Sequence, residues 1–169
     1  AKKYTGNDCP GGIPGLAVPV VGVIGAASEV SAEAGVKKPG SYTEGAQTGI
    51  DTVDNIAGTI DPTWTNCNYL LDLARQVRAA ADVVGNTSTP NSALGTPVAP
   101  KIVFIDGNYS VGGGFNGAGT LWVTGTLTFN GNAGWSGVIF TVGRGVFQRN
   151  GGGNGVISGA NFVANIAGP

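Results

Sequence analysis

The C-terminal part of the chain repeats a short apolar segment. The three clearest copies are residues 102–107, 120–125 and 138–143, which begin at equal intervals along the chain and close with glycine. A fourth copy, residues 161–165, follows after a longer interval. A fixed period of roughly 20 residues, built from strand-length segments and glycine corners, is typical of a β-solenoid. The repeat therefore predicts a mostly β fold, with a short parallel β-solenoid over residues 100–169 and about 18 residues per rung.

Each rung is expected to have three sides. The strong copy forms the first side, and glycines at the corners permit backbone angles that are closed to other residues. The second side comprises weaker copies at residues 109–112, 126–131 and 146–151, and the short third side residues 117–119, 135–137 and 156–159.

Successive strand residues point to opposite faces, and the strong copies carry apolar side chains on both faces. Such a strand is typical of a parallel sheet that is buried on both faces. Alignment of the copies places two sets of residues in the solenoid interior: Val103, Leu121, Ile139 and Phe162, then Ile105, Val123, Thr141 and Ala164. The alternating set faces outward and needs a cover: Phe104, Trp122, Phe140 and Val163.

Residues 65–84 have the periodicity of a long helix that can supply this cover. Asp61-Pro62 and Thr65 offer start signals, and Gly85 offers a stop. The apolar residues that share one helical face are Leu70, Leu73, Ala74, Val77 and Ala81. We therefore expect the helix to pack along the aromatic face of the solenoid.

Residues 1–64 are expected to form an irregular N-terminal cover within a single domain of residues 1–169. Prolines break much of this region, although residues 18–24 favour a strand and residues 26–34 a two-turn helix. The apolar run at residues 12–27 contains two prolines and is shorter than the roughly 20 residues of a membrane-spanning helix. We therefore expect no membrane segment here. Because the sequence starts at Ala1 and has no evident C-terminal cap, we expect the chain to be processed or to be part of a longer protein.

The composition argues against several kinds of chemistry. Charged residues make up 11% of the chain and the net charge is −1, which does not suit binding to nucleic-acid phosphates. Histidine is absent, so a Ser-His-Asp triad is impossible and a zinc site is not expected. Only one acidic residue, Asp106, lies in the solenoid, where capping of a turn is favoured over binding of Ca²⁺ with Asn108. We expect no enzyme activity, no cofactor and no metal ion.

The two cysteines, Cys9 and Cys67, are far apart in the sequence and lack the spacing of metal ligands. We expect them to form a disulfide, which fits an exported protein. Two unpaired thiols are the alternative.

The segments 95–107, 117–125, 135–143 and 150–165 resemble a solenoid domain of bacterial PilX-type, type IV pilus-associated pilin-like surface proteins. Residues 79–84 and the early Gly6-Asn-Asp8 are also similar to that family. The resemblance implies a non-catalytic domain at the cell surface or in an extracellular filament, and it transfers no functional residues. The hydrophobic N-terminal pilin helix of such proteins has no counterpart in this sequence.

Three functions remain open from the sequence. A structural or adhesive domain, outside the bacterial cell or on its surface, could self-assemble or bind other filament subunits through the solenoid ends. An ice-binding protein is the second, although Thr120, Thr124, Thr126, Thr128 and Thr141 form no repeated ladder. A carbohydrate-binding module is the third: Tyr109, Trp135 and Phe147 could stack on the rings of surface glycans, or could instead fill corners and core.

Overall fold

A computed structural model describes residues 4–5, 21–23, 42–43, 53–55, 58–151 and 154–167. The chain divides into two compact units, Ala1–Asp61 and Pro62–Pro169, where the sequence predicted one domain. The division falls close to residue 64, where the N-terminal region was expected to end. Each unit is described by itself below.

The first unit contains two short parallel strand pairs. β1 (Tyr4–Thr5) pairs with β3 (Tyr42–Thr43), and β2 (Val21–Val23) pairs with β4 (Val53–Asn55). β2 lies inside the strand expected at residues 18–24. The helix expected at residues 26–34 lies outside the described residues, and the role of residues 1–64 as a cover stays a prediction.

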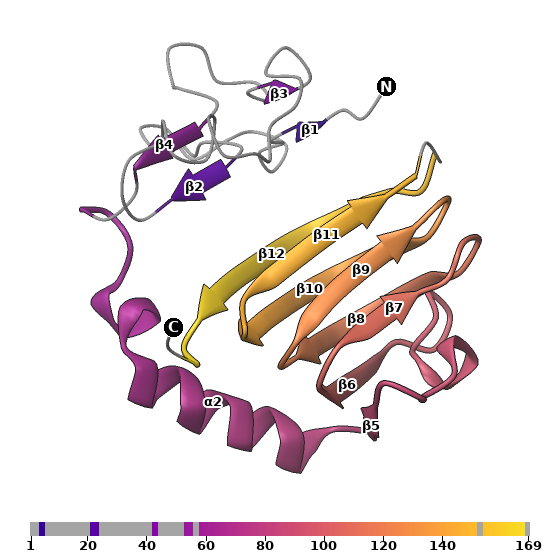
Figure 1. Ribbon diagram of the computed structural model, residues 1–169, viewed down its shortest axis with the longest axis horizontal. Helices are drawn as coiled ribbons and strands as arrows, with labels where there is room; N and C mark the ends of the chain where they lie inside the picture. The colour runs from indigo at the N-terminus through magenta and orange to yellow at the C-terminus, as the bar shows by residue number, and fades with distance from the viewer. Residues whose placement is uncertain are drawn as a thin grey trace. The chain divides into compact units, whose positions relative to one another are not determined.

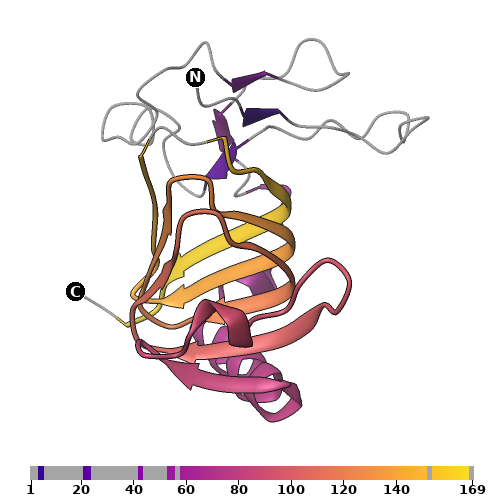
Figure 2. The same ribbon diagram turned by 90° about the vertical axis from the view of Figure 1, so that its right-hand side faces the viewer.

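The second unit is a β-solenoid of parallel strands stacked in two sheets (Figures 1 and 2), which confirms the predicted fold class. The larger sheet has the order β12-β10-β8-β6-β5, and the smaller one has the order β11-β9-β7. The larger sheet comprises β5 (Val83–Asn86), β6 (Lys101–Asp106), β8 (Asn116–Val123), β10 (Gly134–Gly143) and β12 (Ile157–Asn165). The smaller sheet comprises β7 (Tyr109–Val111), β9 (Thr126–Asn130) and β11 (Val146–Asn150).

The third side expected for each rung is not a separate sheet. Its residues form the beginning of the long strands β8, β10 and β12. Each of these strands continues through a glycine with positive φ: Gly119 (φ 115°), Gly137 (φ 130°) and Gly159 (φ 127°). The glycines stack in register, because Gly119 pairs with Gly137 and Gly137 pairs with Gly159.

The strand register shows that the offset between turns varies. Lys101 pairs with Gly119 and Gly119 with Gly137, so these two offsets are equal. Gly137 pairs with Gly159, which makes the next offset four positions longer. In the smaller sheet, the offset between Thr126 and its partner Val146 is two positions longer than the offset between Lys101 and Gly119. In the larger sheet, the period of the first copies thus holds from β6 to β8 and from β8 to β10. The offset is two positions longer from β5 to β6 and four positions longer from β10 to β12.

This lengthening corrects the alignment of the fourth copy. Phe162 pairs with Phe140 instead of Ile139, and the partners of Ile139 and Thr141 in β12 are Asn161 and Val163. The sequence alignment was wrong by one residue, which moves every side chain of β12 to the opposite face. Phe162 therefore belongs to the outward-facing aromatic row, not to the solenoid interior.

The interior between the two sheets is filled by apolar side chains from successive turns. The interior residues predicted from the first three copies are all buried there. The residues predicted from the fourth copy, which forms part of β12, are not. The fully or nearly fully buried residues of the interior are Leu94, Val103, Ile105, Tyr109, Val111, Leu121, Val123, Leu127, Phe129, Ala133, Trp135 and Ile139. Thr141 is also buried, as the polar member of the column that contains Val123.

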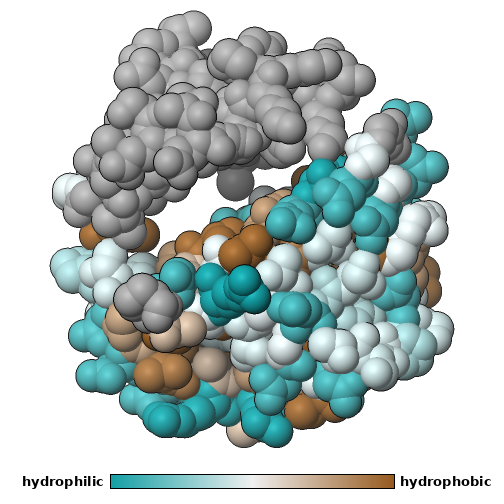
Figure 3. Space-filling view, viewed as in Figure 1, coloured by the Kyte–Doolittle hydropathy of each residue, from teal (hydrophilic) through white to brown (hydrophobic). Residues whose placement is uncertain are grey.

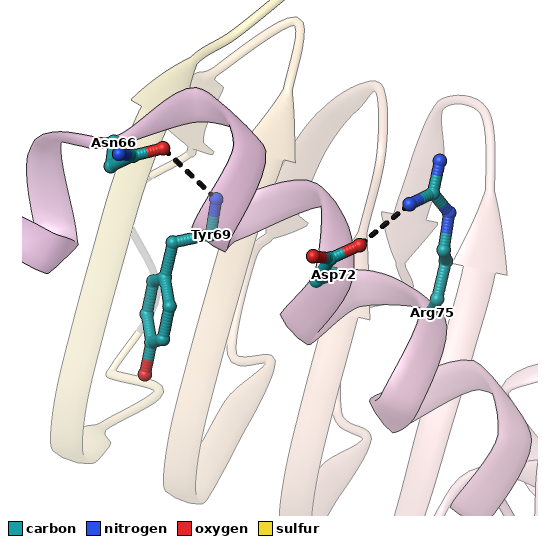
Figure 4. A network of polar contacts seen from close by, with 4 residues as sticks. All are labelled: Asn66, Tyr69, Asp72 and Arg75. Carbon is teal, nitrogen blue, oxygen red and sulfur yellow. Dashed lines mark hydrogen bonds and ion pairs between the residues drawn. The ribbon is translucent and has the colours of Figure 1, made fainter.

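The helix α2 (Cys67–Ala80) follows a short 3-10 helix, η2 (Pro62–Thr65). Asn66 is its N-cap, and the Asn66 side-chain oxygen accepts a hydrogen bond from the Tyr69 N–H at 3.1 Å (Figure 4). The ion pair between Arg75 and Asp72, at 2.6 Å, is exposed and contributes little to stability (Figure 4). The predicted start near residue 65 is thus close to the observed one.

The predicted end of the helix is wrong. Ala81 has an extended backbone, and Val83 and Val84 begin β5, which pairs with β6. Asp82 fixes this transition, because its N–H donates to the Ile102 carbonyl and its carboxylate accepts from the Ile102 N–H, both at 2.8 Å. β-branched residues at 83 and 84 also favour a strand over a helix.

The packing of α2 on the aromatic face is confirmed. Leu70, at 2% exposure, contacts the row formed by Phe104, Trp122, Phe140 and Phe162, with further contacts from Trp64, Leu73, Ala74, Val77 and Ala81. The helix crosses the strands of the larger sheet (Figures 1 and 4). A helix of 14 residues is about 21 Å long, and four gaps of about 4.8 Å separate five strands, about 19 Å in all. The helix is therefore as long as the sheet is wide.

Aromatic rings fix both ends of this contact. Trp122 stacks on Phe140 with a centroid distance of 4.9 Å, and Trp64 lies 5.2 Å from Phe162. The guanidinium carbon of Arg78 lies 5.7 Å from the centroid of the Phe104 ring, near the other end of the helix. Through Trp64, the 3-10 helix η2 just before α2 therefore rests over β10 and β12, and Arg78 places the end of α2 over β6.

We expect Leu70→Ala to lower the free energy of unfolding by about 2–5 kcal/mol, because it opens a cavity beside Trp122. Loss of this packing should also shift tryptophan emission to longer wavelength. The matched control is Leu71→Ala on the same helix, where the side chain is 42% exposed and the cost should stay below about 1 kcal/mol. Urea titration followed by circular dichroism and fluorescence would measure both, and equal losses would contradict the packing.

We expect Gly137→Ala to destabilise the protein by at least about 2 kcal/mol. Its φ is positive, which strains an alanine backbone, and its new Cβ would overlap the carbonyl oxygen of Gly119. Gly113→Ala is the control, because a Cβ there would lie 3.6 Å from its nearest neighbour, the Asn130 oxygen. The control should stay within about 0.5 kcal/mol of the parent. A Gly137→Ala protein as stable as the Gly113→Ala protein would show that this position does not need glycine.

Candidate functional site

The polar residues singled out at the solenoid corners hold successive turns together. The Asp106 carboxylate accepts a hydrogen bond from the Thr124 hydroxyl at 3.0 Å, and Asn108 Oδ1 accepts one from the Thr126 N–H at 2.8 Å. Each bond joins one turn to the next. Among the described residues, no three His, Cys, Asp or Glu side chains gather in a group that could hold a metal ion.

Two of the three aromatic residues considered for sugar stacking are buried. Trp135 is 1% exposed and Tyr109 is 4% exposed, and both belong to the solenoid interior. Trp135 Nε1 donates to the Gly119 carbonyl at 3.2 Å, which satisfies its polar atom inside the protein. Phe147 is partly buried against Phe129, with ring centroids 5.8 Å apart. These three residues therefore form no exposed platform, and the expectation that Tyr109 and Trp135 bind glycans is corrected: they fill the core.

The threonines considered for ice binding do not stack on one another. In register, Thr120 pairs with Val138, Thr126 with Val146, and Thr128 with Ser110 and Gln148. Thr141 is buried between Val123 and Val163. The irregular columns agree with the absence of a threonine ladder in the sequence.

The first end of the solenoid is closed by residues 87–100. Leu94, which follows the 3-10 helix η3 (Asn91–Ala93), is buried in the interior. The Tyr109 hydroxyl lies 2.9 Å from both the Thr89 carbonyl oxygen and Asn91 Oδ1. Lys101 Nζ donates to the Ala93 carbonyl at 3.1 Å. These contacts join the loop to the first turn and exclude solvent from that end.

The last end, which we call the open end, consists of β11, β12 and residues 154–156 before β12. Its residues continue the interior columns, but within the described part of this unit they are much less buried. Val163 is 44% exposed, although it continues the column of Val123 and Thr141. Val156 in the loop is 68% exposed, and Asn161, next to Ile139 in register, is also exposed. The open end is the candidate interaction site of this unit.

Arg149 gives the open end a polar character. It continues the column of the buried Phe129, and its guanidinium donates to the Gly155 carbonyl of the adjoining loop. The rest of the described surface in view is mostly hydrophilic or neutral, with small separate hydrophobic patches (Figure 3).

The predicted disulfide between Cys9 and Cys67 stays a prediction. Cys67 is exposed at the first residue of α2 and is bonded to no cysteine of the described segments. Cys9 lies outside the described residues.

None of the helices described is both long and apolar enough to cross a membrane. A comparison of the chain with protein-family models, curated proteins and solved structures found no match. The candidate site therefore has to be judged from its own geometry.

Burial raises the pKa of Tyr109 above its usual 10.0, so the folded state holds the phenol proton more tightly than the unfolded state. This stabilisation is complete below about pH 10 and is lost as the pH rises through the folded pKa. We expect Tyr109→Phe to cost about 1 kcal/mol at pH 7, because it removes the hydroxyl that joins the closing loop.

The same variant should lose less stability than the parent between about pH 9 and pH 11, one unit either side of that usual pKa. Urea titrations across this range would measure the difference. Tyr69→Phe, at an exposed position on α2, is the control and should follow the parent curve. Parallel curves for the parent and Tyr109→Phe would reject this role.

Proposed function

We propose that this chain is a non-catalytic, exported structural or adhesive domain of a bacterial cell-surface or pilus-like filament protein. The observation that carries the proposal is the difference between the two solenoid ends. One end is closed by its own loop, and the other presents partly exposed Val163 and Val156 beside an edge strand. A solenoid unit with one closed end suits attachment to a partner through its other end.

The sequence supports a role without catalysis. It contains no histidine, and Asp106, the single acidic residue of the solenoid, is engaged in a corner hydrogen bond with Thr124. The flat sheet faces carry side chains that join turns or fill the core.

The sequence resemblance to pilin-like surface proteins motivates the cell-surface and filament parts of this proposal. Residues 117–125 and 135–143 contain most of β8 and β10, including the stacked Gly119 and Gly137 and the buried Trp122 and Trp135. These residues build the solenoid, and a scaffold shared with that family is part of the proposal. The location at the cell surface and the filament role are proposed on top of that scaffold.

Immunogold electron microscopy of cells that produce the protein would test the proposal. Antibodies raised against residues 62–169 should label the outside of intact cells or filaments that extend from them. Protease treatment of intact cells should remove the label, while a cytoplasmic marker protein stays intact as the control. Label that appears only inside permeabilised cells would overturn the proposal.

A further inference from the structure

The strand β12 is a long edge strand of the larger sheet in the second unit. It has nine residues and pairs with β10, and no other strand of the described residues pairs with its outer side. In an edge strand, about half of the backbone N–H and C=O groups point away from the sheet and remain available for another strand.

This edge lacks the features that normally prevent strand addition. Edge strands are usually protected by charged side chains, by proline or by short length. β12 contains no Lys, Arg, Asp, Glu or Pro in its nine residues. The nearby Arg149 belongs to β11 and donates to the Gly155 carbonyl, so its charge is held at the loop. A second copy of β12 would therefore meet no charge repulsion from the strand itself.

The opposite edge of the same sheet is different. β5 has four residues, and its last residue, Asn86, begins a turn in which the Asn86 side chain accepts from the Ser88 N–H at 2.8 Å. The closing loop then covers the interior through Leu94. A head-to-tail chain of copies would need β12 to match this short edge along its length, and the short strand cannot pair with the whole of the long one.

We propose that β12 pairs with β12 of a second copy of this chain, so that association through the open end produces a closed two-fold dimer. This deepens the proposed function, on which it rests, by naming the partner and the geometry of assembly. Two identical edges related by a two-fold axis run antiparallel, and the contact uses the same residues on both sides. Pairing along the whole strand places its middle residue, Asn161, next to its own copy.

The same pairing also explains the exposed apolar side chains at the open end. Val163 lies within β12 and Val156 immediately before it, so a second strand laid along this edge would reduce the exposure of both. Asn161 is exposed at the centre of the strand, where a polar amide can remain beside a symmetric partner. The edge supplies backbone hydrogen bonds, and its apolar residues supply buried surface.

Charge placement at Asn161 tests the proposal. Sedimentation velocity of the full chain over a range of concentrations should show a monomer–dimer equilibrium without larger species. Asn161→Lys and Asn161→Glu should each weaken dimerisation by roughly tenfold or more, because like charges then lie opposite one another. An equimolar mixture of the two variants should form dimers again, since opposite charges now face each other.

Val84→Lys is the matched control, because Val84 is 51% exposed on the edge strand at the closed end. It should dimerise like the parent, and circular dichroism should confirm that all variants are folded. A strictly monomeric parent, open-ended polymers, or dimers that neither Asn161 variant weakens would overturn the edge pairing. Such a result with intact surface labelling would reject the pairing alone, whereas loss of surface labelling would reject the proposed function whatever the oligomeric state.

Discussion

Every turn of this solenoid has to lie on the previous one in register, and the glycine bends are where that requirement is tightest. At Gly119, Gly137 and Gly159 the backbone of one turn approaches the carbonyl of the turn before so closely that no Cβ fits. Because Gly119, Gly137 and Gly159 stack in register, they fix which side chains of each long strand point inward after them. Interior columns such as Val103, Leu121 and Ile139 follow from that alignment. The packing of the core is thus a consequence of the backbone register.

The helix α2 solves a problem that the same register creates. A strand with apolar residues on both faces fills the interior with one set and exposes the other to water. Stacking four such strands in register produces a continuous aromatic row, whose exposure would be costly for an isolated solenoid. One helix suffices as a cover because its length of about 21 Å matches the width of the sheet, about 19 Å. The chain then enters β5 directly through Asp82, so the cover and the first strand are joined without a long loop.

The sequence predicted the fold class, the helix and its contact face because these depend on local periodicity. Residues one repeat apart stack on one another, and residues spaced at three and four share a helix face. The register of β12 could not be predicted in the same way, because four additional residues enter between Gly137 and Gly159 and shift Phe162 by one position relative to the apparent repeat. The burial of Tyr109 and Trp135 could not be predicted from residue type alone. Both carry polar atoms that partners in other turns satisfy, Thr89 for one and Gly119 for the other.

The open end combines two opposite tendencies, and this conflict makes it the most informative part of the second unit. Its side chains resemble a terminus: Asn161 and Arg149 replace the apolar residues that precede them in the interior columns, which lets water approach without a large cost. Its backbone does not, because β12 is long, uncharged and free of proline. If the last turn had only to end the core, a short or charged strand would serve better. The side chains of β12 tolerate solvent, and its backbone groups remain available for pairing. Such a strand suits a partner that binds through main-chain hydrogen bonds and can dissociate again, leaving both subunits folded.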